Sequence, residues 1–228
     1  MADQETAAHP LRERIIRCVR KLDDPPTTAD VQPRPLVSDF DLTPGERPVP
    51  SAPLTPAAVL VPIVERSDGL TVLLTKRTDH LHDHAGQVSF PGGRTEEADE
   101  GPVRTALRET EEELGLGPSF IHVIGFLDAY ETATGFLVTP VVGLVAPGFR
   151  LTPDRFEVAE VFEAQLSFLL DPANHQIKGR TVRGMRYGFY ELAYGEYIIW
   201  GATAGMLVNL YRRVISKERP DRTPNPPR

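Results

Sequence analysis

Apolar residues recur at a helical spacing over residues 102–114 of the chain. At about 100° per residue, such a spacing gathers them into one stripe that faces a core. The stripe consists of Val103, Ala106, Leu107, Thr110 and Leu114. Pro102 suits a first helical turn, Asp99 can cap that turn, and Gly115 is placed to end the helix. The pattern therefore predicts an amphipathic helix over residues 102–114.

Other segments divide into helices and strands by the same reasoning. Helical spacing at residues 10–22 and 202–215 predicts one short helix at the start and one final helix. Asp68-Gly69 separates two apolar runs and is a hairpin signal. Strands are expected at residues 57–64, 71–77, 87–90, 121–130, 136–145, 156–162 and 185–200. This periodicity indicates a domain of mixed α and β structure.

Proline is frequent before the first predicted strand, which suppresses regular structure there. We expect residues 1–56 to form an N-terminal helix and a Pro-rich arm, to which we assign no chemistry. Residues 57–216 are expected to form the folded domain, and residues 217–228 a disordered tail.

Composition excludes several classes of function. The chain has 228 residues and a formal net charge of −7. This charge argues against broad nucleic-acid binding, which favours a basic face. No run approaches the ~20 apolar residues of a membrane span, and the N-terminus lacks the apolar region of a secretory signal. The single cysteine, Cys18, cannot form an internal disulfide. A cytoplasmic protein that binds neither membrane nor nucleic acid is expected.

Three carboxylates change the picture of the predicted helix. Glu109, Glu112 and Glu113 stand at i, i+3 and i+4, where side chains are neighbours about 5–6 Å apart at Cβ. Like charges at this spacing weaken a helix, and a bound hard cation such as Mg²⁺ or Mn²⁺ would offset the repulsion. Arg108, four residues before Glu112, can brace a carboxylate. The alternative is a solvated acidic face.

The residues around these carboxylates resemble the Nudix box. Gly92-Gly93 makes a turn just before the helix, so that backbone carbonyls can approach a ligand. The box reads Gly93, Asp99, Arg108, Glu109, Glu112, Glu113, Gly115 and Leu116. Asp99 replaces the usual Glu, and the gap from Asp99 to Arg108 is one residue longer than usual. In both departures the chain resembles the coenzyme A pyrophosphatase branch of the Nudix hydrolases. The resemblance implies an α/β/α sandwich around a mixed β-sheet.

A second motif lies just upstream and resembles the signature of the same branch. The matching residues are Leu73, Leu74, Thr75, Arg77, Gly86, Phe90, Pro91, Gly92 and Gly93, whereas His82 stands where that signature has Arg and Thr78 where it has Ser or Ala. Lys76 and Arg77 can donate to the phosphates of a nucleotide. We expect substrate contacts from Lys76, Arg77, His82, Gly86, Phe90 and Gly92. The run His80, His82 and His84 also invites a transition-metal interpretation, but a polar loop over the substrate is favoured.

The general base is not specified by the box. Glu157, Glu160 and Glu163 follow it, and Nudix enzymes often recruit one extra carboxylate from outside the box. We choose Glu160 for this role, although all three can equally face solvent. Trp200, near the start of the final helix, is expected to pack and not to bind ligand.

The resemblance implies a diphosphatase that uses Mg²⁺ or Mn²⁺. Its ligands would be Glu109, Glu112 and Glu113, with the Gly93 carbonyl as a fourth. The implied substrate is coenzyme A or acyl-CoA, and the implied products are 4′-phosphopantetheine and adenosine 3′,5′-bisphosphate. Two alternatives remain: a Nudix hydrolase for ADP-ribose or NADH, and a non-catalytic Nudix module. The resemblance also suggests a homodimer.

Overall fold

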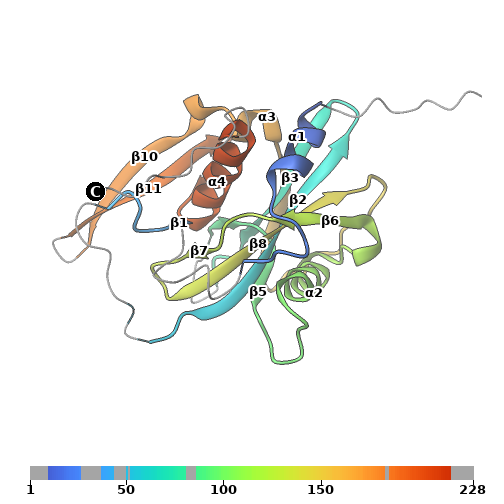
Figure 1. The fold of residues 1–228 in the computed structure, drawn as a ribbon, viewed down its shortest axis with the longest axis horizontal. Helices are drawn as coiled ribbons and strands as arrows, with labels where there is room; N and C mark the ends of the chain where they lie inside the picture. Colours follow the sequence, from blue (N-terminus) through green and yellow to red (C-terminus); the bar gives the residue numbers. More distant parts are fainter. Residues whose placement is uncertain are drawn as a thin grey trace, which may run out of the picture.

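The computed structural model describes residues 10–26, 37–43, 50, 52–80, 86–182 and 185–216. For residues 182, 185 and 186 it describes the backbone alone. Two β-sheets and several helices make up this part of the chain (Figure 1). The final tail, residues 217–228, and His82 lie outside the described residues.

The larger sheet is mixed and, over the described residues, has nine strands. Its order is β1-β7-β8-β2-β3-β4, with β5 paired to β2, β6 to β8 and β9 to β3. The strands are β1 (Val37–Ser38), β2 (Thr55–Arg66), β3 (Gly69–Arg77), β4 (Val88–Ser89), β5 (Gly92–Arg94), β6 (Ile121–Phe126), β7 (Tyr130–Glu131), β8 (Phe136–Val145) and β9 (Val158–Gln165). β2 and β8 run parallel, whereas β2 and β3 form the predicted hairpin, which closes at the Arg66–Gly69 pair.

The smaller sheet is antiparallel and follows the larger one in sequence. It consists of β10 (Gln176–Val182), β11 (Met185–Tyr194) and β12 (Tyr197–Trp200). The α-helices are α1 (Pro10–Cys18), α2 (Pro102–Leu114), α3 (Leu166–Leu169) and α4 (Ala202–Ser216), and two 3₁₀ helices are η2 (Pro118–Phe120) and η3 (Pro172–Asn174). None of the helices described is both long and apolar enough to cross a membrane.

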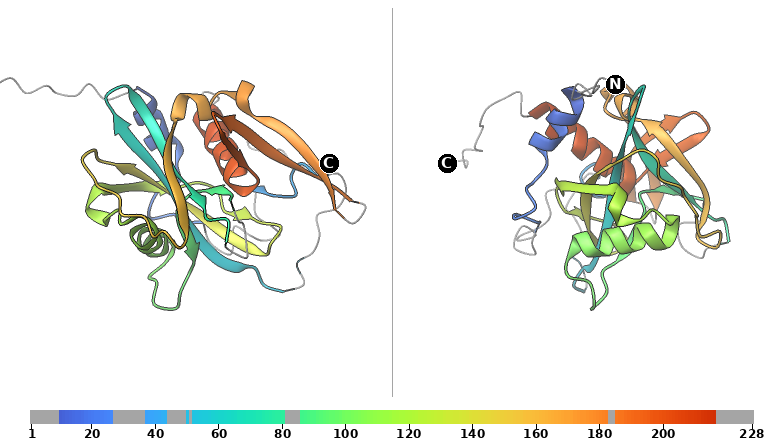
Figure 2. Two further views of the ribbon diagram at one scale, coloured as in Figure 1. Left: turned by 180° about the vertical axis from the view of Figure 1, so that it is seen from behind. Right: turned by 90° about the vertical axis from the view of Figure 1, so that its right-hand side faces the viewer.

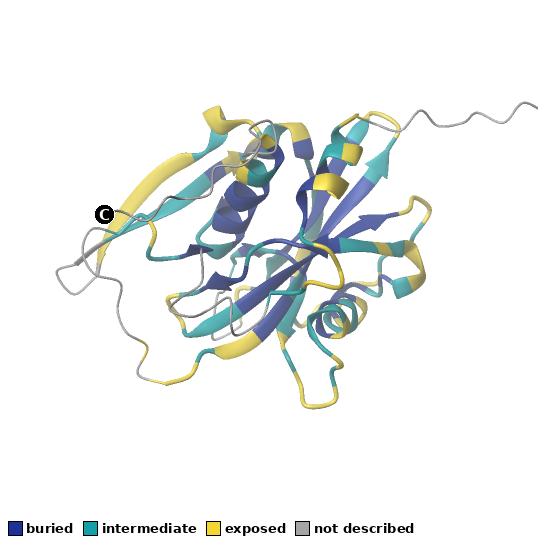
Figure 3. Ribbon diagram, in the orientation of Figure 1, coloured by how far each residue is buried: buried dark blue, intermediate teal, exposed yellow. Residues whose placement is uncertain are grey.

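The central strands bury both of their faces, which explains their almost wholly apolar sequences. On β2, Ala58 and Leu60 pack with Ala106 of α2, whereas Val61 and Ile63 belong to the core that includes α1 and α4. In Figure 1, α2 accordingly lies on one side of the β2–β8 pair and α4 with the smaller sheet on the other. The buried residues gather on these strands and on α4 (Figure 3). The fold is therefore the expected Nudix-like arrangement of helices around a mixed sheet.

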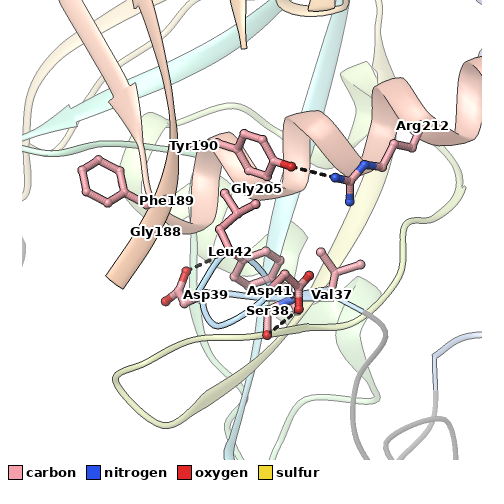
Figure 4. A pocket seen from close by; sticks show the side chains of 12 residues that line it. Val37, Ser38, Asp39, Asp41, Leu42, Gly188, Phe189, Tyr190, Gly205 and Arg212 are labelled. Atoms are coloured by element: carbon pink, nitrogen blue, oxygen red, sulfur yellow. Dashed lines mark hydrogen bonds between the residues drawn. The ribbon is translucent and has the colours of Figure 1, made fainter. Parts of the chain in front are cut away.

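Part of the N-terminal arm is built into the domain. β1 pairs with β7, and the Asp39 carboxylate accepts hydrogen bonds from the Tyr130 hydroxyl at 2.8 Å and the Ala133 N–H at 2.7 Å. A Cβ at Gly188 of β11 would lie 2.4 Å from the Leu42 carbonyl oxygen, so the arm touches the smaller sheet directly. Figure 4 shows this contact region between the arm, β11 and α4. The arm therefore helps to join the two sheets.

Several element bounds differ from the expectations: the first helix ends at Cys18, and the segments expected as single strands at 121–130 and 185–200 each contain two strands. β2 begins at Thr55, before the predicted domain start at residue 57. β10 is a strand that the periodicity of the sequence does not predict, and most of its residues are exposed (Figure 3). From behind, β3 and β9 are seen side by side, which places the segment after the box helix against the upstream motif (Figure 2).

Candidate active site

The box helix α2 begins and ends as its sequence indicates, except for its cap. Pro102 occupies its first turn and Gly115 ends it in the left-handed conformation, with a φ of +66°. The N-cap residue is Gly101, and no side chain caps the helix. The expectation that Asp99 caps it is therefore wrong. The Asp99 carboxylate instead accepts hydrogen bonds from a charged side chain on the second turn of the helix.

That partner is Arg108, whose guanidinium organises the exposed side of the box. It donates to both carboxylate oxygens of Asp99, at 2.9 and 3.1 Å, and to the Arg94 carbonyl. Its Nη1 also lies 3.0 Å from a carboxylate oxygen of Glu109 and 3.0 Å from one of Glu112. The hydrogen bonds from Arg108 hold the pKa of the Asp99 carboxyl well below its usual range. Arg108 thus braces the box carboxylates, as its spacing indicates.

The three box glutamates differ sharply in exposure. The Glu113 side chain is 6% exposed, Glu109 is 19% exposed and Glu112 is 60% exposed. Glu113 accepts a hydrogen bond from the Gly92 N–H at 3.3 Å, and Nη1 of Arg77 lies 3.7 Å from its carboxylate. Glu109 and Glu113 therefore lie against the Gly-Gly turn of β5, whereas Glu112 is the most exposed of the three.

The Glu113 carboxylate is buried without enough positive charge nearby to balance its own. Burial raises the pKa of Glu113 to about 8, and the nearby Arg77 and the Gly92 N–H offset only part of that rise. Burial also raises the pKa of Glu109 above its usual value, against the opposing effect of Arg108. A divalent cation would stabilise both groups in their charged form. Because the available donors are all oxygens, the set fits a hard cation.

The carboxylates as placed do not yet converge on one point. Over the described residues, no group of three or more His, Cys, Asp or Glu side chains is arranged to hold an ion. Glu109 and Glu112 are instead turned toward Arg108, which supplies positive charge at that position. The composition of the site therefore fits a hard cation, whereas the carboxylates are paired with arginines.

Gly93 is required by the position of Glu109. A Cβ at residue 93 would lie 2.4 Å from the carboxyl carbon and from one oxygen of Glu109. Gly92 is constrained in a different way, because its φ is +154° and a Cβ there would meet the Ala58 carbonyl oxygen at 2.5 Å. The Gly-Gly pair therefore allows β5 to lie directly against the box helix.

We expect Gly93→Ala to lower kcat/KM by about 100-fold, since misplacing a catalytic group by about 1 Å can have an effect of this size. The added methyl group would push the Glu109 carboxylate away from β5. Gly117→Ala is the matched control, because the nearest atom to its added Cβ would be 3.9 Å away. Unchanged steady-state kinetics in Gly93→Ala would show that Glu109 is not needed at this position.

Strand alternation decides which upstream and downstream side chains face the box. β3 and β9 pair with a register shift between Lys76 and Arg77. Arg77 is opposite Val158, which belongs to the apolar cluster on the α2 side, so Arg77 faces α2. Lys76 is opposite Glu160, and both point to the other face. Lys76 is therefore not beside the box, contrary to what we expected of a phosphate ligand there.

Glu160, which we chose as the base, also lies away from the box. Its carboxylate accepts a hydrogen bond from the Tyr197 hydroxyl, on the side of the sheet away from α2. Glu157, which precedes β9, instead has a carboxylate oxygen 3.8 Å from Nη2 of Arg77. Glu163 is paired with Arg66. Among the three candidates, Glu157 is thus the carboxylate placed near the box.

A cavity of about 380 Å³ adjoins the box at Gly92 and Arg77. Of the other residues expected to contact substrate, Phe90 lines this cavity, whereas Lys76 and Gly86 do not. A neighbouring lobe of about 370 Å³ extends from it toward the smaller sheet. Five residues line both: Asp39, Ala133, Arg180, Trp200 and Gly201. Both volumes lie in the range of small-ligand pockets.

Several cavity residues have no signal in the sequence. Asp39 and Phe40 come from the Pro-rich arm, and Arg180 comes from the unpredicted strand β10. Trp200, which we expected only to pack, lines both lobes. These residues meet through contacts between distant segments, and a spacing rule within one segment cannot reveal such contacts.

Comparison with known proteins gives consistent matches. The sequence matches the NUDIX domain family over residues 54–178. A protein of Escherichia coli (strain K12) described as uncharacterized Nudix hydrolase NudL is 42% identical over 155 residues, which cover 68% of this chain and 80% of its own length. Its namesake in Photorhabdus laumondii is 40% identical over 158 residues, which cover 69% and 84%.

The chain is less similar to solved structures than to these relatives. A MutT/nudix family protein from Enterococcus faecalis is 18% identical, with a TM-score of 0.46, and the similarity covers 75% of this chain and 66% of that protein. The family assignment depends instead on the sequence match, which spans more than half of the chain. With relatives at this identity, the chain belongs to the Nudix hydrolase family and is a Nudix-type diphosphatase that acts on nucleoside diphosphate derivatives.

Proposed function

We propose that this enzyme hydrolyses the diphosphate bond of coenzyme A or acyl-CoA. The products are 4′-phosphopantetheine, or its acyl form, and adenosine 3′,5′-bisphosphate. The observation that carries the proposal is the junction of two motifs at Glu113. Arg77 of the upstream motif and Gly92 of the Gly-Gly turn both contact this box carboxylate, and both line the cavity.

Glu109, Glu112 and Glu113, together with the Gly93 carbonyl, would hold Mg²⁺ or Mn²⁺, since all of them offer oxygen ligands. Nudix hydrolases generally use divalent cations. When bound, such an ion offsets the negative charge of a diphosphate and lowers the pKa of a bound water molecule.

The chain's own residues provide the remaining functions. Arg77 donates hydrogen bonds to the diphosphate oxygens, since it faces both the box and the cavity. A water molecule attacks one phosphorus, and Glu157 takes its proton as the general base. The bond from that phosphorus to the bridging oxygen breaks, and the bridging oxygen remains on the phosphate of the other product. Arg108 orients Glu109 and Glu112 through its hydrogen bonds to both carboxylates.

A diphosphatase for ADP-ribose or NADH is the second candidate. It is favoured by His82, which replaces the Arg of the coenzyme A signature. Histidine has an unperturbed pKa of about 6.5, so it would hold an anion less firmly than arginine at neutral pH.

The two candidates are separated by comparing kcat/KM for coenzyme A, ADP-ribose and NADH with Mg²⁺ and with Mn²⁺. We expect coenzyme A to be preferred by at least about tenfold, which corresponds to about 1.4 kcal/mol of transition-state binding. His82→Arg is the informative variant and is expected to raise the preference further. A preference for ADP-ribose or NADH in the wild-type enzyme would overturn the coenzyme A proposal.

A further inference from the structure

The lobe of the cavity farther from the box has an aromatic lining. Phe40, Tyr187, Phe189 and Trp200 line it, and the ring centroids of Phe189 and Trp200 are 5.6 Å apart. Phe40 reaches it from the N-terminal arm, whereas the other three belong to the smaller sheet. Aromatic faces of this kind stack favourably with planar heterocycles.

The pairing of the smaller sheet places Arg180 among these rings. Arg180 is opposite Tyr187, and Phe189 follows Tyr187 by two residues. Trp200 is opposite Glu191, two residues further along β11. Because opposite residues of antiparallel strands share a face and alternate residues do too, Arg180, Tyr187, Phe189 and Trp200 all lie on one face of this sheet.

Among the residues that the structure describes, none forms a hydrogen bond or an ion pair with the Arg180 side chain, which lines both lobes of the cavity. Lys178, another basic residue of the same strand, is paired instead: its Nζ lies 3.7 Å from a carboxylate oxygen of Glu191. The other charged residue of the lobe, Asp39, accepts hydrogen bonds from Tyr130 and Ala133. The lobe therefore combines aromatic rings with a guanidinium that is available to an anion.

We infer that this lobe binds a purine nucleoside carrying a phosphate monoester, with the base stacked on the aromatic rings and the monoester bound by Arg180. Arginine binds phosphate through planar, charge-assisted hydrogen bonds. The inference rests on the proposed function and deepens it. With the diphosphate at the box, it assigns the far lobe to the 3′-phosphoadenosine half of the substrate and leaves the uncharged pantetheine half outside.

Arg180 is then the residue that distinguishes coenzyme A from diphosphates that lack the additional phosphate. Loss of one charge-assisted contact to a phosphate corresponds to about a 10- to 100-fold loss of affinity. Arg180 should therefore contribute to affinity only for ligands that carry the phosphate monoester.

Calorimetric titration with adenosine 3′,5′-bisphosphate and with AMP tests this without any turnover. The wild-type protein is expected to bind the bisphosphate about 10- to 100-fold more tightly than AMP. Arg180→Gln should remove that difference and leave AMP affinity within about twofold. Lys178→Gln removes the same unit of charge from the same strand outside the cavity lining and should preserve the difference.

The kinetic counterpart compares coenzyme A with dephospho-coenzyme A, and Arg180→Gln should lower kcat/KM only for the former. Equal wild-type affinity for the two nucleotides, or an equal loss for both in Arg180→Gln, would overturn the inference. If Arg180 discriminates between the nucleotides but coenzyme A is not hydrolysed, the phosphate subsite is correct and the proposed substrate is wrong.

Discussion

Glu112→Gln is expected to lower kcat/KM by about 1,000-fold, or about 4 kcal/mol of transition-state stabilisation, while the protein stays folded. The side chain of Glu112 is 60% exposed, and its carboxylate pairs with Arg108 on the preceding turn. An exposed pair of this kind contributes at most about 0.5 kcal/mol to stability. The substitution therefore separates a loss of metal binding from a loss of folding.

Glu111→Gln is the matched control, because it removes the same charge from an exposed position on the same helix. We expect it to retain turnover within about twofold. Steady-state kinetics over a range of Mg²⁺ concentrations, together with thermal unfolding, make both measurements. Wild-type turnover in Glu112→Gln would mean that the box carboxylates do not hold the metal.

Asp99→Asn is expected to destabilise the fold by about 2–3 kcal/mol, because it weakens a doubly hydrogen-bonded pair with Arg108. The Asp99 side chain is 3% exposed, so water replaces these contacts poorly. Turnover should fall as well, since Arg108 also holds Glu109 and Glu112. Denaturant unfolding at neutral pH measures the stability difference.

Acid unfolding tests the same pair through its charge. Arg108 lowers the pKa of folded Asp99, whereas an unfolded Asp titrates near about 3.9. The contribution of the pair is therefore fully present above about pH 4 to 5 and is lost as the pH falls below that range. The difference in stability between the wild type and Asp99→Asn should shrink accordingly. Glu96→Gln, at a 65% exposed side chain 3.9 Å from Arg108, should have little effect at any pH.

The box helix could be predicted from sequence because its information is local. The 3.6-residue period, Pro102 and Gly115 indicate the helix Pro102–Leu114, which the structure contains. The spacing of Arg108 and Glu112 likewise indicates their contact. The role of Asp99 could not be inferred in the same way, because a short acidic residue before a helix serves equally as a cap or as an ion-pair partner.

Which of the downstream glutamates lies near the box depends on how β3 and β9 pair. The pairing of β3 with β9 shifts between Lys76 and Arg77, which moves Val158 to the α2 face and leaves Glu160 on the other. A single-residue irregularity of this kind reverses which side chains face the helix. The sequence of residues 156–163 carries no sign of it, so Glu157 and Glu160 are indistinguishable there.

The cavity could not be predicted because its walls come from distant segments. Asp39 and Phe40 come from a Pro-rich stretch without periodicity, and their positions depend on contacts with Tyr130 and Ala133. Arg180 lies on β10, whose exposed residues do not show the apolar alternation of a half-buried strand. Tertiary contacts alone bring these residues together beside the box.

Hydrolysis of the diphosphate bond of coenzyme A is tested by identifying the products formed with Mg²⁺ or Mn²⁺, using chromatography and mass spectrometry. We expect equal amounts of adenosine 3′,5′-bisphosphate and 4′-phosphopantetheine from the wild-type enzyme, and almost none from Glu112→Gln. Release of inorganic phosphate or dephospho-coenzyme A would contradict cleavage of the diphosphate bond. No turnover of coenzyme A with either metal, by enzyme that hydrolyses ADP-ribose or NADH, would contradict the proposed substrate.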